Sequence, residues 1–132
     1  MALFLPDTTV LIDHLRGRRG VTERLLELTR QGHLLISCSI TIAELFSHLR
    51  PPEELSAQML LSGLIYRDIP RRAAEQAGRL RYTLARQGRT LSAPDALIGG
   101  LAVTIGATLL TKNIYDFSAL PGLALEELPH GL

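Results

Sequence analysis

Five side chains in this sequence stand where they could do chemistry, because each follows a strand-like apolar run or lies near the start of a predicted helix. They are Asp7, Glu44, Asp95, Asn113 and Asp116. In a parallel α/β sheet, ligands bind outside the carboxyl ends of the strands. The spacing therefore predicts that these four acids and one amide meet on a single rim of the sheet.

Carboxylates gathered on one rim repel one another, and a fold keeps them together at low cost when a cation neutralises them. Oxygen ligands without His or Cys suit Mg²⁺ or Mn²⁺ better than zinc. Such ions clamp a scissile phosphate and lower the pKa of an attacking water. The chemistry that the residue types predict is hydrolysis of a phosphodiester.

The stretch from Ser92 to Val103 indicates how one of these acids is positioned. Ser92 is a favourable N-cap, Pro94 suits the first turn, and Asp95 follows where the helix dipole favours negative charge. Residues 96–111 carry no charge, so this helix is expected to pack on both flanks with Asp95 at the edge of the core.

Each acid also has a purely structural explanation. Thr41 to Glu44 fits a capping box in the first turn of a helix, Asp7 suits a helix cap, and Asp116 suits a turn. It is the shared placement of the acids, more than any one of them, that favours a site.

Alternating apolar runs and helical periodicities supply the elements that must position these residues. Strands are predicted at 3–5, 34–37, 64–69, 107–110 and 123–125, with helices between them and Thr8 or Thr9 capping the first helix. This order predicts a single domain, 1–132, with three α/β/α layers around a mostly parallel sheet of four to five strands. The pair Gly99 and Gly100 within the apolar helix predicts a close backbone approach.

Composition narrows the class of protein. With 132 residues, 46% hydrophobic content and a net charge of +1, the chain is long enough for one core and is not a bulk polycation. The single cysteine, Cys38, excludes an internal disulfide and is expected to be buried. We expect a cytoplasmic protein, because no apolar run reaches the length of a membrane span and the N-terminus does not resemble a secretory signal.

Arginines cluster in one part of the chain, with seven of them between Arg67 and Arg89. Arg72, Arg79 and Arg86 recur on the outward side of the helix predicted from Pro70, and they form a candidate phosphate-binding ridge. A solvated helix face with a Glu75–Arg79 pair is the competing interpretation. The basic turn from Arg16 to Arg19 is a second candidate for holding phosphates.

Four short motifs, taken in order, resemble PIN-domain ribonucleases and, more narrowly, VapC-type toxins of prokaryotic toxin–antitoxin pairs. They are DTTVLID at 7–13, IAEL at 42–45, PDALI at 94–98 and LTKNIYDF at 110–117. The resemblance implies a PIN-like fold, an RNA substrate, a homodimer and a VapB-type antitoxin whose C-terminal segment covers the acidic rim.

The resemblance also implies roles for individual residues. Asp7, Glu44 and Asp95 would form the acidic triad that binds Mg²⁺ or Mn²⁺, and Thr8 and Thr111 would position ligands or phosphate. Asn113 stands where many relatives carry Asp, so the fourth ligand is either this amide or Asp116.

Three other interpretations compete with a nuclease. A catalytically weakened PIN-fold module that binds RNA or protein is supported by Asn113. An aspartyl phosphatase normally has a second Asp two residues after its nucleophile, where this chain has Thr9. A histidine-based hydrolase is disfavoured because no Ser or Cys motif accompanies the histidines at 14, 33, 48 and 130.

Overall fold

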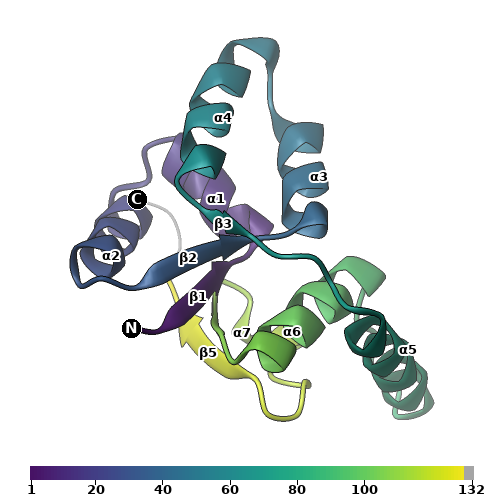
Figure 1. The fold of residues 1–132 in the computed structure, drawn as a ribbon. Coiled ribbons are helices and arrows are strands. Elements are labelled where there is room, and N and C mark those ends of the chain that lie inside the picture. The colour runs from purple at the N-terminus through teal and green to yellow at the C-terminus, as the bar shows by residue number, and fades with distance from the viewer. Residues whose placement is uncertain (130–132) are drawn as a thin grey trace.

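A five-stranded sheet stands at the centre of the structure, a computed structural model that describes residues 1–129 (Figure 1). The strands are β1 (Leu3–Pro6), β2 (Leu34–Ser37), β3 (Ile65–Tyr66), β4 (Thr108–Thr111) and β5 (Ala124–Glu127). The helices are α1 (Thr8–Leu15), α2 (Arg19–Arg30), α3 (Ser39–His48), the 3₁₀ turn η1 (Pro51–Glu53), α4 (Glu54–Ser62), α5 (Arg71–Arg86), α6 (Ala93–Ile105) and α7 (Ile114–Phe117). His130 lies outside the described residues.

The strand order is β3-β2-β1-β4-β5, and every pair of neighbouring strands is parallel. From the central β1 the chain builds outward to β2 and β3, then crosses back to place β4 and β5 on the other side. The carboxyl ends of β1 and β4 therefore flank the point where the winding direction reverses. In sheets of this kind that point is where ligands bind.

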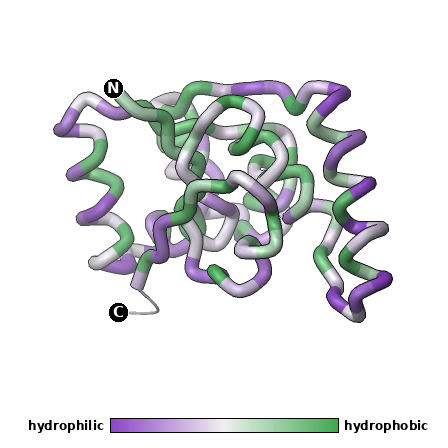
Figure 2. The backbone as a smooth tube through the Cα atoms, turned by 90° about the horizontal axis from the view of Figure 1, so that it is seen from below, coloured by the Kyte–Doolittle hydropathy of each residue, from purple (hydrophilic) through white to green (hydrophobic). Residues whose placement is uncertain are grey.

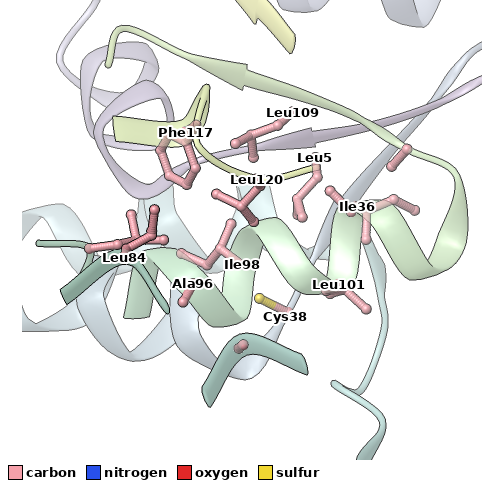
Figure 3. Close-up of a cluster of buried hydrophobic side chains, with 14 residues drawn as sticks. Leu5, Ile36, Cys38, Leu84, Ala96, Ile98, Leu101, Leu109, Phe117 and Leu120 are labelled. Carbon is pink, nitrogen blue, oxygen red and sulfur yellow. The ribbon is translucent and has the colours of Figure 1, made fainter. Parts of the chain in front are cut away.

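Helices cover both faces of the sheet, which confirms the three predicted layers. On one face, the strand residues Leu5, Ile36 and Leu109 pack against α5 and α6, with Ile98 and Leu101 of α6 in the same cluster (Figure 3). α6 is uncharged after Asp95, as the sequence predicts for a helix between the sheet and a second helix layer. Cys38 is fully buried in this cluster.

The opposite face of the sheet carries a separate cluster, in which Val10 of α1 and Val21, Leu25 and Leu28 of α2 meet Leu110 of β4. Successive strand residues alternate between the two faces, so Leu109 and Leu110 belong to different clusters. Hydrophobic residues accordingly gather along the central strands, while polar residues lie along the outer helices (Figure 2).

A third apolar cluster lies beyond the carboxyl ends of the strands, where α1, α3 and α4 meet. Leu11, Leu45 and Ala57 form its buried centre. This cluster fixes α3 against α1, and Figure 1 shows α3 and α4 standing away from the sheet as a hairpin. Among residues 1–129, no helix is both long and apolar enough to cross a membrane.

Two predicted elements differ from the structure. The strand expected at 64–69 is reduced to Ile65–Tyr66, because it is an edge strand paired with β2 alone and Pro70 caps the helix that follows. Asp116, which suits a turn by its residue type, lies instead in the short helix α7. One turn of helix is too short for apolar periodicity to reveal it.

The close approach predicted at Gly99 and Gly100 is present. A Cβ atom added at Gly100 would lie 3.3 Å from the backbone oxygen of Ala73 on α5, and one added at Gly99 would lie 2.4 Å from a methyl group of Leu120. The two glycines therefore let α6 pack tightly against α5 on one side and against the segment after α7 on the other.

We expect Gly99→Ala to lower the free energy of unfolding by up to about 2 kcal/mol, because overpacking a core costs about 1–3 kcal/mol and the helical advantage of Ala, about 1 kcal/mol, offsets part of that cost. Gly78 on α5 is the matched control, since a Cβ atom there would meet nothing within 4 Å. Gly78→Ala should raise the free energy of unfolding. Urea denaturation measures both variants, and equal stabilisation of the two would contradict the close approach.

Candidate active site

Asp7 sits at the junction of the two central strands. It follows β1, its backbone N–H donates to the Leu110 carbonyl of β4 at 2.9 Å, and its side chain is buried. Asp7 Oδ1 accepts from the backbone N–H of Val10 at 3.0 Å, and Oδ2 accepts from Thr111 Oγ1 at 2.5 Å. Asp7 is therefore the N-cap of α1, and the prediction that Thr8 or Thr9 caps this helix was wrong.

The environment of Asp7 raises its pKa from an ordinary value of 3.8 to about 6. Burial is the largest cause, because it disfavours the charged form, and the nearby Asp95 carboxylate acts in the same direction. The hydrogen bonds from Thr111 and Val10 and the charge of Lys112 oppose the rise. The fold thus holds this carboxyl where its ionised form is less stable than in water.

Glu44 reaches the same place from α3. Thr8 Oγ1 donates to Glu44 Oε1 at 2.7 Å, which joins the start of α1 to the middle of α3. The capping box predicted for Thr41 and Glu44 was wrong: α3 begins at Ser39 after the N-cap Cys38, whose N–H donates to Thr41 Oγ1 at 3.1 Å. Glu44 consequently lies beyond the first turn, and its carboxylate does not cap the helix.

Asp95 occupies the first turn of α6, as the sequence predicts. Ser92 is the N-cap and its Oγ accepts from the Asp95 N–H at 3.2 Å. Asp95 is half-buried, and its pKa is raised mainly by that burial, then by the charges of Glu44 and Asp116, while the Ser92 hydrogen bond opposes the shift. The acids on α3, α6 and α7 are therefore close enough to act on one another electrostatically.

The three acids of the predicted triad line one cleft of about 150 Å³. Its lining residues are Asp7, Thr8, Thr9, Ile12, Glu44, His48, Asp95 and Ile98. The cleft lies beside the point where the winding of the sheet reverses. The prediction that acids distant in sequence converge at the carboxyl ends of the strands is thus supported by the fold.

His48 is a cleft residue that the sequence analysis did not assign to the site. Its Nδ1 donates to the Glu44 carbonyl oxygen at 2.8 Å within α3. The i to i+4 spacing from Glu44 to His48, which places both on one helix face, is the signal that would have found it.

Asn113 and Asp116 lie beside this cleft rather than among its lining residues. Asn113 Nδ2 donates to Asp116 Oδ2 at 2.7 Å, and the Asn113 N–H donates to Thr111 Oγ1 at 2.9 Å. Thr111 therefore connects this pair to Asp7. The structure brings both candidates for the fourth ligand to the same rim, with the half-buried Asp116 acting on Asp95 through its charge.

The fit of this site to a metal ion depends on the chemistry of its donors. Within residues 1–129, no three Asp, Glu, His or Cys side chains converge tightly enough to form a ready-made metal centre. The polar residues that line the cleft are three carboxylates, two threonines and His48, and the pKa values of Asp7 and Asp95 are both raised. Mutually repelling carboxylates suit a hard divalent cation, so the acids Asp7, Glu44 and Asp95 fit Mg²⁺ or Mn²⁺.

The predicted arginine ridge is exposed on α5, and none of its three members lines the cleft. The Arg86 guanidinium stacks over Tyr82, 3.7 Å from the ring centroid. Glu75 pairs with Arg71 at 3.2 Å, so the pairing predicted with Arg79 was wrong. A phosphate-binding role for Arg72, Arg79 and Arg86 stays a prediction.

In the basic stretch from Arg16 to Arg19, which leads into α2, the arginines are engaged in ion pairs. Arg16 pairs with Glu53 at 3.4 Å, Arg18 with Asp13 at 3.9 Å and Arg19 with Glu23 at 3.1 Å. These contacts neutralise part of the charge of the turn. They leave it less suited to holding phosphates than its sequence suggests.

The structure thus has a parallel sheet of order β3-β2-β1-β4-β5 and an acidic cleft where the winding of the sheet reverses. A comparison with family models identifies the protein family that has these features. The PIN domain model matches residues 4–123, so the chain belongs to the PIN domain family.

Within that family, the chain is similar to several VapC proteins. The tRNA(fMet)-specific endonuclease VapC of Shigella flexneri is 31% identical over 134 residues, covering 96% of this chain and 98% of the relative. Ribonuclease VapC19 of Mycobacterium tuberculosis is 29% identical over 119 residues, covering 90% of this chain and 95% of the relative. The crystal structure of DNA-bound VapBC from Salmonella typhimurium contains a chain that is 27% identical, with a TM-score of 0.82 and coverage of 96% and 98%.

The raised pKa of Asp7 predicts how stability depends on pH. The folded state binds this proton more tightly than the unfolded chain, so the contribution to stability is fully present below about pH 4 and is lost as the pH rises through about 6. Between these limits we expect Asp7 alone to lower the free energy of unfolding of the metal-free protein by up to about 3 kcal/mol.

Asp7→Asn is the matched variant, because an amide oxygen can still cap α1. Urea denaturation at a series of pH values measures both proteins. The free energy of unfolding of the wild type minus that of the variant should fall steadily from about pH 4 to pH 7. A difference that does not vary with pH would contradict the assigned environment.

Proposed function

We propose that this protein is a metal-dependent ribonuclease, the toxin of a VapBC-type toxin–antitoxin pair, which hydrolyses RNA phosphodiester bonds. The observation that carries the proposal is the cleft that Asp7, Glu44 and Asp95 share at the carboxyl ends of β1 and β4. Similarity to VapC proteins named as ribonucleases and endonucleases supports the same activity.

Asp7 and Asp95 are the residues best placed to hold Mg²⁺ or Mn²⁺, with Glu44 and the Asn113–Asp116 pair completing the site. Each Asp7 oxygen accepts one hydrogen bond from the protein, which leaves a lone pair on each for a further ligand. A bound divalent ion would supply charge neutralisation and a water of lowered pKa.

The remaining chemistry falls to groups of the chain itself. Thr111 and Val10 hold the Asp7 carboxylate in one orientation, and Thr8 fixes Glu44 opposite the start of α6. Donors that lock carboxylates in place reduce the reorganisation needed when a phosphate enters. The Glu44 carboxylate does not cap α3, so it is available to accept a proton from an attacking water.

The acidic cleft also suggests what kind of protein partner binds this chain. The Salmonella typhimurium relative was solved as a VapBC complex, and we propose that this chain is likewise inhibited by a VapB-type antitoxin. Carboxylates around an acidic cleft suit an antitoxin arginine, which can bind a carboxylate bidentately much as a cation would. A homodimer is proposed by the same resemblance.

Asp95→Asn tests the nuclease directly. We expect purified wild-type protein, freed of antitoxin, to cut a mixed pool of single-stranded and structured RNA with Mg²⁺ or Mn²⁺ and to stop with EDTA. The variant should lose at least about a hundredfold in rate, because removing a group that activates water or holds its metal costs on the order of 10²–10⁴. Gel analysis of the RNA measures the cleavage.

Asp68→Asn is the matched control, because it makes the same change at an exposed position that does not line the cleft. It should cut at the wild-type rate. Cleavage by Asp95→Asn equal to wild type would overturn the site. Folded wild-type protein that binds RNA but cuts none of the pool with either metal would instead favour a catalytically weakened PIN-fold binding module.

A further inference from the structure

An arginine and a tyrosine from distant parts of the chain pair beside the acidic rim. The Arg89 guanidinium carbon lies 4.4 Å from the centroid of the Tyr115 ring. The same guanidinium donates to the backbone carbonyl oxygen of Tyr115, and to Ser118 Oγ at 3.3 Å. These contacts hold the loop after α5 against α7.

Both members of the pair have unused binding capacity. Tyr115 is 71% exposed although one side of its ring faces Arg89, so the rest of the ring is open to solvent. The ion pairs formed within the described chain do not include Arg89, and its acceptors are a neutral carbonyl and a hydroxyl. An open aromatic face beside an uncompensated guanidinium is the pairing that holds a base and its phosphate in single-stranded nucleic acid.

The position of the pair relates it to the candidate active site. Tyr115 directly precedes Asp116, which accepts from Asn113, and Asn113 in turn donates to the Thr111 hydroxyl that binds Asp7. Tyr115 therefore shares the short helix α7 with Asp116, one of the two candidates for the fourth ligand, and this places the pair next to the rim of the cleft.

A groove continues from Arg89 along α5. It has a volume of about 290 Å³, and its lining residues include Arg81, Tyr82 and Arg89. Tyr82 repeats the arrangement of Tyr115, with Arg86 stacked on its ring. The groove thus offers a second aromatic ring and further positive charge along one path.

We infer that Arg89 and Tyr115 form a nucleotide-binding platform, on which an RNA base stacks on Tyr115 while Arg89 contacts the backbone phosphate, and that the strand continues into the groove beside Tyr82. The inference rests on the proposed function, because it takes RNA as the bound strand. It assigns to this pair the positioning of the substrate on one side of the scissile bond.

If the role of Arg89 were purely structural, it would need only the backbone carbonyl of Tyr115 and not its ring. Arg89 holds the loop after α5 against α7 through a hydrogen bond to the backbone carbonyl of Tyr115, and any residue at that position supplies this carbonyl. Tyr115→Ala therefore keeps that hydrogen bond and removes the ring. A structural role predicts no effect on RNA binding, whereas the platform predicts a loss.

The chain contains no tryptophan, so Tyr115→Trp introduces a single fluorescent reporter at the platform. The experiment uses the full chain with Asp95→Asn added to prevent cleavage, titrated with a single-stranded RNA oligonucleotide. Stacking of a base should quench the fluorescence. Leu26→Trp in the same background, at an exposed apolar position on α2, is the matched control and should show no quenching.

A second measurement uses Tyr115→Ala. With Asp95→Asn added, we expect it to weaken RNA binding about tenfold, since losing one base–aromatic stack has an effect of about that size. With Asp95 intact, KM should rise while kcat stays close to wild type. Leu26→Ala is the control in both assays.

The outcomes separate this inference from the proposed function. Absence of quenching together with unchanged binding by Tyr115→Ala, in a wild type that cuts RNA, overturns the platform alone. Quenching and a tenfold loss of binding in a wild type that never cuts RNA uphold the platform and overturn the nuclease.

Discussion

The buried carboxylate of Asp7 is the constraint on which the rest of this structure depends. It can remain at the junction of β1 and β4 because Val10 and Thr111 donate to its two oxygens, and the Asp7 N–H in turn binds Leu110. A buried acid without such donors would cost several kcal/mol, on the order of the whole stability margin of a small domain. The strand order, with β4 directly beside β1, therefore sets the chemistry as well as the packing.

Each of the other acids around Asp7 is positioned by its own hydrogen bond. Thr8 fixes Glu44 from α1, Ser92 starts the helix that carries Asp95, and Asn113 binds Asp116. Thr8 and Asn113 donate directly to a carboxylate, whereas the Ser92 hydroxyl accepts from the Asp95 backbone N–H, and none of the three neutral groups cancels the charge of an acid. The result is a rim whose negative charge is positioned by the fold and left for a cation to neutralise.

Much of this could be predicted from the sequence, because the carboxyl ends of parallel strands share one edge and apolar runs locate the strands. Asp95 behind Ser92 needed only local capping rules. Glu44 was placed correctly at the rim but assigned a wrong local role, since the cap of α3 uses Cys38 and Thr41. His48 was missed although its i to i+4 spacing from Glu44 places both on one face of α3. The Arg89–Tyr115 pair was missed because its contact depends on how the loop after α5 packs against α7 and not on any local pattern. A single turn such as α7 gives no periodic signal at all.

The hydrogen bond between Asp7 and Thr111 joins residues 104 positions apart, so the order of synthesis matters to this protein. Ribosomes add about 5–20 residues each second, and roughly 5 to 20 s therefore separate the appearance of the two partners. During that interval β1 lacks β4, and the first acid lacks the hydroxyl that orients it. A growing chain consequently lacks the complete acidic cleft until Thr111, 104 positions after Asp7, has emerged and β4 can pair with β1.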